Sequence, residues 1–417
     1  NTTYTYSVLA TNATGDSLST ATSTQLTAPD ITGTPTFSNI TADAMRVSWT
    51  APTGGASTYK LERCAGSGCS DYVSVSTGIA ALFFDDSGLS ANVTYRYRVR
   101  ATNATGDGLY SAGAEQTTSP NPPTVTTQAA SSLAATTATL NGTIVATGGA
   151  NATVRGFAYS SSATLASGVS TTTNNGDYGA GAFTEDISSL VGNTVYYYRP
   201  YATNGGGTSY GSIELFLTYP GTPDAASYDT TTATTTGVLW SEALGGAASY
   251  ELTQCQEATC SVFGAISGNS TTTYSLAGNT SYSYAVRGHN ATGYTTFSAT
   301  TTRLTLPGMP GTPSFSTIEG TSLTLSWTGP VGSTSSYKIE RCTGSACSDY
   351  GQIASGVGTT SYNDTGLMSS TIYSYRVRAT NATGDGLYSA GAEATTDVVP
   401  PSVATDNATG ILSAAAA

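Results

Sequence analysis

The sequence is poor in charged residues, and the few it has are mostly acidic. Lys and Arg number 14 against 26 Asp and Glu among 417 residues, which gives a formal net charge of −12 and a charged fraction of 10%. Binding along a nucleic-acid backbone depends on clustered Lys and Arg. The basic residues here, such as Arg96, Arg98 and Arg100, are two residues apart and lie along single strand faces. We therefore expect no nucleic acid among the partners.

Long apolar runs and repeated catalytic groups are also missing. No run of about eighteen apolar residues occurs, so we expect no membrane span in this segment. The single histidine, His289, falls in the stretch RGHN, which we interpret as a turn, without a nucleophile at a matching position. The recurring acids Glu62/Glu340 and Asp71/Asp349 recur with the repeats, whereas a catalytic carboxylate pair is expected once. We predict no enzyme activity, no catalytic residue, no cofactor and no metal.

What the chain does contain is one repeated segment. Residues Tyr373–Gly386 have the sequence YSYRVRATNATGDG. Close copies of this segment begin at Tyr4 and Tyr95, and less similar copies begin at Tyr196 and Tyr282. Because side chains alternate along a strand, Tyr373 and Tyr375 are expected on one face and Arg376 on the other. The Asn, small residues and glycines that follow are typical of a tight turn between antiparallel strands.

The repeat has the period of a small all-β domain. The turn asparagines are 86 to 101 residues apart, which is too long for a solenoid. They are Asn12, Asn103, Asn204, Asn290 and Asn381. Pro35–Thr118 aligns without a gap with Pro313–Thr396 at a constant offset of 278 residues, and Trp49 falls on Trp327. The chain is therefore predicted to be a string of similar domains.

Each repeat resembles the fibronectin type III domain. A Pro-rich start leads to a strand ending in Trp, as in VSWTAP at Val47–Pro52, and then to a Tyr-Lys-hydrophobic-Glu-Arg strand. A Leu-x5-Tyr element precedes the repeated strand, in the pairs Leu89/Tyr95, Leu190/Tyr196, Leu276/Tyr282 and Leu367/Tyr373. In that family the Trp is a core residue and Leu-x5-Tyr forms a tyrosine corner. The resemblance implies an all-β fold of tandem seven-stranded immunoglobulin-like β-sandwiches, and the short Pro-bearing linkers predict a beads-on-a-string rod.

We predict four complete domains flanked by two partial ones. Residues 1–27 match the last strands of a domain and residues 398–417 the start of a further one, so we expect this to be a segment of a longer protein. The complete domains, here numbered 1 to 4, are predicted at residues 28–118, 119–218, 219–306 and 307–397. Domain 2 is a variant that has Leu140 in place of the Trp and no cysteines. In domain 2, Val154–Tyr159 is predicted to pair with Ala138–Ile144.

The six cysteines form three pairs of identical spacing. The pairs are Cys64/Cys69, Cys255/Cys260 and Cys342/Cys347. A four-residue gap that contains Gly or Ala fits a hairpin whose ends are closed by a disulfide, and such local pairs persist only in an oxidising compartment. A metal site is the competing interpretation, but two thiols per site and one histidine in the chain do not complete tetrahedral zinc. We predict three disulfides.

The sequence is rich in Asn-x-Ser/Thr sequons, which are acceptors for N-glycosylation. The candidate sites are Asn12, Asn39, Asn92, Asn103, Asn141, Asn151, Asn269, Asn279, Asn290, Asn363, Asn381 and Asn407. Asn1 also begins a sequon. Repetition inflates this number, and a Thr-rich β-protein whose turns favour Asn is the competing explanation.

Three other features allow both a functional and a structural explanation. Asp85-Asp86 and Asn363-Asp364 have calcium-ligand chemistry, but Asp and Asn also end strands, which we favour. Thr105–Asp107 and Thr383–Asp385 occupy the loop that in some animal relatives of the fold carries an Arg-Gly-Asp motif, but both lack the arginine, so we favour a plain hairpin turn. Exposed tyrosines could stack on sugars or pack across strands, and we favour packing for Tyr110, Tyr197 and Tyr388.

These observations predict a non-enzymatic structural segment. We expect a segment of a microbial extracellular or cell-surface fibre, stalk or adhesin shaft. Its expected partners are copies of the same chain or neighbouring repeats, with which it self-associates, and surface glycans. The alternative is a set of spacer or sugar-binding accessory domains of a secreted polysaccharide-degrading enzyme. A receptor or adhesion ectodomain is a third interpretation.

Overall fold

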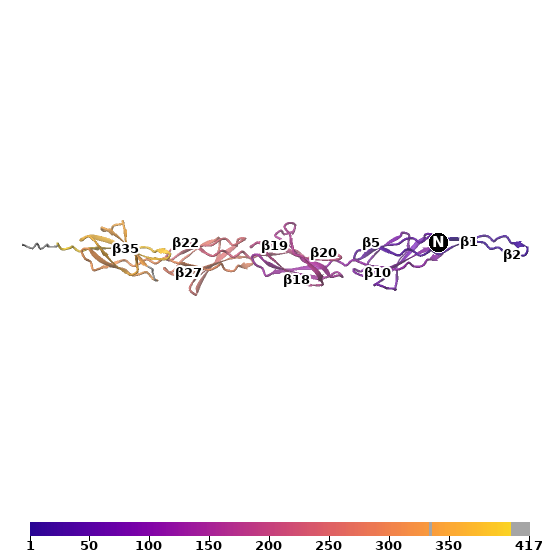
Figure 1. The fold of residues 1–417 in the computed structure, drawn as a ribbon, viewed down its shortest axis with the longest axis horizontal. Coiled ribbons are helices and arrows are strands. Elements are labelled where there is room, and N and C mark those ends of the chain that lie inside the picture. Colours follow the sequence, from indigo (N-terminus) through magenta and orange to yellow (C-terminus); the bar gives the residue numbers. More distant parts are fainter. Residues whose placement is uncertain (333–335, 402–417) are drawn as a thin grey trace, which may run out of the picture. The chain divides into compact units, whose positions relative to one another are not determined.

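In the computed structural model, residues 1–332 and 336–401 are described, and every regular element in them is a β-strand (Figure 1). The sequon at Asn407 and most of the predicted start of a further domain lie outside these residues. The chain divides into two compact units. Unit 1 comprises residues 1–190 and 194–218, and unit 2 comprises residues 191–193 and the described part of 219–417.

Unit 1 begins with a hairpin that contains two pairs of short strands. Strand β1 (Thr3–Tyr6) pairs with β4 (Ser23–Leu26), and β2 (Thr11–Asn12) pairs with β3 (Gly15–Asp16). Nearly all side chains of these four strands are exposed. The segment has the strand-and-turn pattern predicted from the repeat.

Domain 1 follows as two sheets. The three-stranded sheet has the order β5-β6-β9, with β5 (Thr36–Ser38), β6 (Ala44–Ser48) and β9 (Phe83–Ser87). The second sheet has the order β11-β10-β7-β8, and β12 also pairs with β10. Its strands are β7 (Thr58–Ala65), β8 (Val73–Ile79), β10 (Thr94–Asn103), β11 (Gly106–Asp107) and β12 (Ala114–Thr117). Because β11 and β12 are two parts of one final strand, this is the predicted seven-strand arrangement.

Domain 2 has the same two layers with longer strands. One sheet, β13-β14-β18, contains β13 (Thr124–Ser131), β14 (Ala138–Ala146) and β18 (Gly181–Ile187). The other is built around β15 and β19. Its strands are β15 (Ala152–Ser160), β16 (Ser170–Thr171), β17 (Asn174–Tyr178), β19 (Val195–Asn204), β20 (Gly207–Tyr210) and β21 (Glu214–Leu217).

The predicted pairing of Val154–Tyr159 with Ala138–Ile144 is wrong. Strand β14 is hydrogen-bonded to β13 and β18, whereas β15 is hydrogen-bonded to β19 in the opposite sheet. The connection between β14 and β15 crosses from one layer to the other, so strands that are consecutive in sequence face each other across the core. Both strands are largely apolar on one face, and that pattern does not distinguish pairing in one sheet from packing between two.

Unit 2 contains domains 3 and 4. Domain 3 has the sheet β22-β23-β26, formed by β22 (Ser227–Thr231), β23 (Thr236–Leu239) and β26 (Ser270–Thr273). Its second sheet contains β24 (Ser249–Gln256), β25 (Thr259–Ile266), β27 (Ser281–Asn290), β28 (Gly293–Tyr294) and β29 (Thr301–Leu304). Domain 4 has the sheet β30-β31-β34, formed by β30 (Ser314–Ser316), β31 (Ser322–Ser326) and β34 (Ser361–Thr365). Its second sheet contains β32 (Ser336–Thr343), β33 (Gly351–Val357), β35 (Ile372–Asn381), β36 (Gly384–Asp385) and β37 (Ala392–Thr395).

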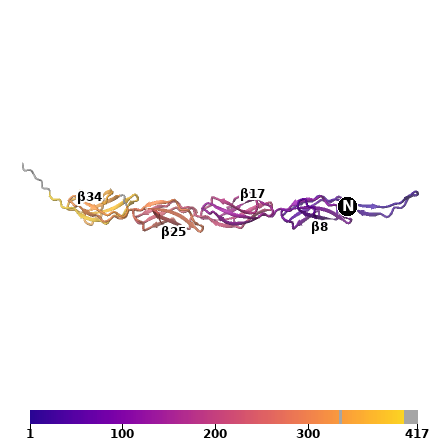
Figure 2. The same cartoon turned by 90° about the horizontal axis from the view of Figure 1, so that it is seen from below.

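Each complete domain has its own hydrophobic core, and in Figure 2 the strands β8, β17, β25 and β34 belong to four different domains. In domain 1 the Trp49 ring packs against Tyr59 at 5.5 Å between centroids. The corresponding pairs in domains 3 and 4 are Trp240/Tyr250 and Trp327/Tyr337. The core of domain 2 instead contains Phe157 and Phe183, with ring centroids 5.0 Å apart, in one cluster with the fully buried Leu140.

The repeated strand has the predicted two faces, and the tyrosine corner is present. Along β35, Tyr373, Tyr375 and Val377 are buried, while Arg376 is half-buried. The backbone N–H of Ser90 donates to the Tyr95 hydroxyl at 2.9 Å. Tyr282 and Tyr373 accept the same bond in domains 3 and 4. The all-β class and the tandem immunoglobulin-like sandwiches are thus confirmed.

Candidate functional site

All six cysteines are paired as disulfides in the spacing the sequence predicts. In domains 1 and 4 the bridge closes a loop, with Cα atoms 6.0 Å apart in both. In domain 3, Cys255 and Cys260 instead face each other across the hairpin β24–β25, with Cα atoms 4.0 Å apart. The same cysteine spacing therefore occurs in two local structures, a loop and a hairpin.

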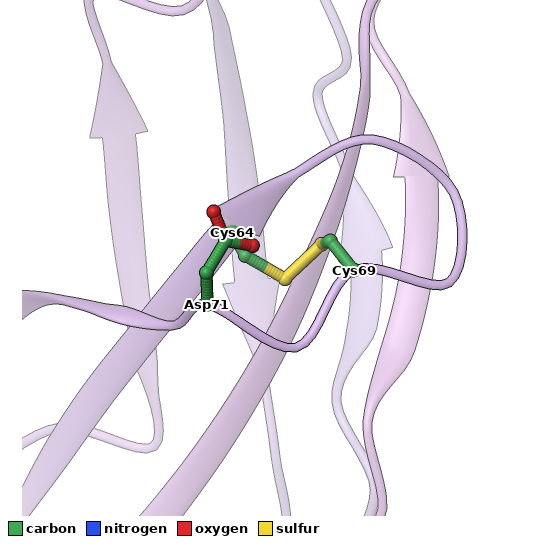
Figure 3. Close-up of side chains that lie close together, drawn as sticks. All are labelled: Cys64, Cys69 and Asp71. Atoms are coloured by element: carbon green, nitrogen blue, oxygen red, sulfur yellow. A yellow bond between two sulfur atoms is a disulfide. The ribbon is translucent and has the colours of Figure 1, made fainter.

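A cluster with metal-ligand chemistry lies at two of these bridges. Figure 3 shows Cys64 and Cys69 joined by their sulfur atoms with Asp71 beside them, and the three potential ligand atoms lie within 4.8 Å of one another. Cys342, Cys347 and Asp349 repeat the arrangement. Because each sulfur is bonded to its partner, neither is a thiolate, which is the form that binds metals. The oxidised cluster offers one exposed carboxylate.

An arginine–tyrosine stack covers the outer face of the larger sheet in domains 1 and 4. The Arg98 guanidinium lies 4.0 Å from the Tyr72 ring centroid and 3.9 Å from that of Tyr110. Arg98 also donates to Glu62 at 2.6 Å, and the Tyr110 hydroxyl donates to the same carboxylate. In domain 4 the group is Arg376, Tyr350, Tyr388 and Glu340. Cation–π and hydrogen-bond contacts within one domain hold these tyrosines, which supports cross-strand packing over sugar stacking.

The carboxylates considered for calcium are divided between the two faces of one strand. Asp86 is 4% exposed and accepts hydrogen bonds from Arg63 at 2.5 Å and from the Tyr97 hydroxyl at 2.8 Å. Burial and the bond to Asp86 raise the pKa of Tyr97 above its ordinary value. Asp85 is paired on the outside with Arg46 at 2.7 Å. Both carboxylates thus have cationic partners, which favours the structural interpretation.

The remaining candidate groups are also held by their own domains. Asp107 of the Thr-Gly-Asp stretch is paired with Lys60 at 2.8 Å and Arg100 at 2.9 Å. His289 lies in strand β27 rather than in a turn, and its ring is 4.3 Å from that of Tyr294, its cross-strand partner. A surface hollow of about 520 Å³ in domain 2 has Asp186 as its one carboxylate.

The structure places the sequons in different environments. Asn39, Asn151, Asn269 and Asn363 are exposed on single domains, and so is Asn12 in the first hairpin. Asn141 donates to Ala129 from strand β14. The side chains of Asn103, Asn290 and Asn381 are buried. Asn92 donates to Gly149, and Asn279 accepts from Asn381, so these two contact the following domain.

Sequence reasoning missed the contacts of the turn asparagines Asn103 and Asn381 with the preceding repeat. A signal was present in the sequence, because two of the sequons that precede a repeated strand recur at a constant distance from the turn asparagine of the next repeat, as Asn1 with Asn103 and Asn279 with Asn381. Nothing in a single repeat indicates that these two positions meet, since they belong to neighbouring domains.

The paired sheets, separate cores and tyrosine corners define a chain of immunoglobulin-like β-sandwiches in tandem. Residues 28–117 and 308–395 match the family model of the fibronectin type III domain, so the chain carries that domain twice. Among the described residues, none forms a helix long and apolar enough to cross a membrane.

Two solved structures illustrate the similarity. The FN1–FN3 domains of chicken CNTN1 are 18% identical, with a TM-score of 0.27, and the match covers 67% of this chain and 100% of that one. A two-domain fibronectin type III segment from chicken tenascin is 19% identical, with a TM-score of 0.30, and the match covers 42% of this chain and 99% of that one. No curated protein matches the chain.

Proposed function

We propose that this chain is a non-enzymatic structural segment of a microbial extracellular fibre, stalk or adhesin shaft. The observation that carries the proposal is the tandem arrangement of domains whose polar side chains are paired within the protein. In domains 1 and 4 the carboxylates Glu62, Asp86, Glu340 and Asp364 all contact an Arg or Tyr of their own domain. Groups held this way stabilise a β-sandwich and leave little free chemistry for a substrate.

The disulfides support a location outside the cytoplasm. Cysteine pairs persist in oxidising compartments such as the cell surface and the medium. All six cysteines are used, and each pair closes within one domain. An extracellular shaft built this way resists local opening without depending on a large core in each small domain.

Immunogold electron microscopy of the source cells tests the proposal. An antibody against residues 313–396 is expected to label thin fibres that leave the cell, and preabsorption with purified chain should abolish that label. Label dispersed in the medium or on substrate particles would overturn the shaft and support the accessory-domain alternative, as would retention of the chain on insoluble polysaccharide.

Self-association is the second part of the proposal. The acidic net charge of −12 opposes close approach of copies at low salt, so association should strengthen when salt screens the charge. Sedimentation of the purified chain at native ionic strength measures this directly. Chains that stay monomeric at high concentration under those conditions would contradict self-assembly and leave the structural role of the single chain in place.

A further inference from the structure

In unit 2, the turn after strand β35 makes its hydrogen bonds to the preceding domain. The side-chain nitrogen Nδ2 of Asn381 donates to the Thr305 carbonyl and to Asn279 Oδ1, each at 2.8 Å. The Thr383 hydroxyl donates to the Leu304 carbonyl at 2.8 Å. Asn381 Oδ1 accepts from the Thr383 backbone N–H at 2.9 Å. Asn381 is 7% exposed, and every polar group of the Asn-x-Thr side chains has a partner.

The same contacts occur in unit 1, where Asn103 and Thr105 bond to the repeat that precedes their own domain. Asn103 Nδ2 donates to the Thr27 carbonyl at 2.8 Å and to Asn1 Oδ1 at 2.7 Å. The Thr105 hydroxyl donates to the Leu26 carbonyl at 2.8 Å. The three partners stand at the constant offset of 278 residues from those of Asn381. The contact between domains has therefore been duplicated together with the domain.

Domain 2 shows that the asparagine is kept where the sequon is absent. Asn204 stands in NGGG, which is not a glycosylation acceptor. Its Nδ2 donates to the carbonyls of Asn121, Thr147 and Ala150 at 2.8, 2.8 and 3.1 Å. Asn121 lies in the Pro-rich start of domain 2, before strand β13. Hydrogen bonding at the domain end, rather than an acceptor sequence, is what these turns share.

We infer that the N-x-T-G turns at Asn103 and Asn381 are joints between consecutive domains, and that N-glycans are confined to the exposed sequons. N-glycosylation joins the anomeric carbon of a lipid-pyrophosphate-linked sugar to Nδ2, releases the lipid pyrophosphate and removes one Nδ2 proton. Both protons of Nδ2 in Asn381 are used in hydrogen bonds, so a glycan there removes one bond and inserts a sugar into a buried contact. At Asn39, Asn151 and Asn269, Nδ2 has no hydrogen-bond partner among the described residues.

The inference stands apart from the fibre proposal, because it concerns contacts within one chain. Glycan mapping of the full chain, secreted from a host that N-glycosylates, provides the first test. The sequence NATGD occurs at Asn12, Asn103 and Asn381, and only Asn12 is exposed. We expect glycan at Asn12 and at the exposed sequons, with unmodified peptides at Asn103 and Asn381. Equal occupancy at all three NATGD sequences would overturn the inference.

Hydrogen exchange on the unglycosylated full chain provides the second test. The amides of Asn279 and Thr280 in domain 3 are bonded to Leu306 and Thr305, beside the joint. The substitution Asn381→Ala removes two hydrogen bonds to that region and should speed exchange there about tenfold. Asn269→Ala, the same change at an exposed sequon of domain 3, should leave it unaltered. Unchanged exchange at Asn279 and Thr280 in the Asn381 variant would contradict the joint.

A variant on the domain 3 side of the contact keeps the test valid if the Asn381 variant of domain 4 does not fold. Asn279 has a φ of 47°, which glycine adopts without strain, so Asn279→Gly removes Oδ1 and keeps the backbone. We expect faster exchange at the amides of Thr383 and Gly384, which lie in the other domain. Protection that is lost only around residue 279 would mean that the asparagine serves its own turn, and the joint would be rejected.

Discussion

At the scale of single residues, Asp85 and Asp86 show how strand alternation separates two neighbouring carboxylates. Asp86 points into domain 1, where it holds the Arg63 guanidinium and the Tyr97 hydroxyl. Asp85 points outward and is 57% exposed at its side chain. Domain 4 repeats the inner group with Asp364, Arg341 and Tyr375. The pattern of the sequence predicts two carboxylates at a strand end, but only the fold shows that one of them is buried.

The buried carboxylate should matter far more for stability than its neighbour. Asp86→Ala leaves the buried Tyr97 phenol and the half-buried Arg63 guanidinium without their acceptor, and we expect domain 1 to lose about 3 kcal/mol. Asp85→Ala, the matched change one residue away, should leave the unfolding midpoint of domain 1 unchanged because that pair is in solvent. Thermal unfolding of the full chain measures both. Equal effects of the two substitutions would refute the internal role of Asp86.

Glu62 gives domain 1 a pH dependence of known sign. Burial raises the pKa of this carboxyl, but the hydrogen bonds from Tyr110 and Arg98 outweigh it and hold the pKa below the ordinary value of 4.5. A carboxyl whose pKa is lower in the folded than in the unfolded state stabilises the fold at pH values above the unfolded pKa. This stabilisation is lost as the pH falls through the folded pKa. We expect the unfolding midpoint of domain 1 to fall as the pH drops below about 4.5.

The substitution Glu62→Gln tests this assignment. It should lower the stability of domain 1 at neutral pH and reduce its acid dependence, because the glutamine does not titrate. Domain 4 is the internal control, since Glu340 has the same partners and its pKa is lowered in the same way. If the midpoint of domain 1 kept its full acid dependence in the variant, another group would be responsible.

At the scale of strands and turns, the sequence predicted the faces of each strand better than the pairing between strands. Alternation of tyrosine and arginine decides which residues of β35 are buried, because the side-chain period of a strand is two. Pairing of β14 with β15 was predicted wrongly, because the alternation of side chains does not indicate whether the chain crosses to the other sheet between two strands. The cysteine spacing likewise predicted a disulfide across a hairpin, which domain 3 has, but not that in domains 1 and 4 the same spacing would close a loop.

The linker before domain 4 passes close to the turn after β36. A Cβ atom added to Gly386 would lie 2.5 Å from the Pro307 carbonyl oxygen, which is closer than real Cβ contacts come. We expect Gly386→Ala to move the linker and to lower the stability of domain 4 by about 1–3 kcal/mol, as overpacking does. Proteolysis within residues 304–313 and the unfolding midpoint report the change.

Gly358 provides the matched control in the same domain. An added Cβ there meets nothing within 4 Å, so Gly358→Ala should leave linker cleavage and the midpoint unaltered. If Gly386→Ala behaved like the control, the close passage of the linker would not constrain this joint. Gly108 and Pro29 repeat the contact in unit 1, also at 2.5 Å, so the result can be reproduced there.

At the scale of the whole chain, the domains share an architecture but differ in what stabilises them. Each has a separate core, and domains 1 and 4 have nearly the same one, down to the rings around Trp49 and Trp327. Domain 2 lacks both the Trp and the disulfide and relies on Phe157 and Phe183. Composition and repeat length predicted several small cores, because each repeat carries its own Leu-x5-Tyr element and alternating strands.

This difference predicts how the chain unfolds when its disulfides are reduced. Closing a loop of this size stabilises a domain by about 2 kcal/mol in the chain-entropy estimate, which corresponds to about 10 °C for a domain of this length. Calorimetry with reductant should therefore lower the transitions of domains 1, 3 and 4 and leave domain 2 in place. Leu140→Ala assigns the domain 2 transition, since that fully buried side chain belongs to its core alone. A domain 2 transition that moved with the others would mean that the cores unfold as one cooperative unit, because domain 2 contains no cysteine of its own.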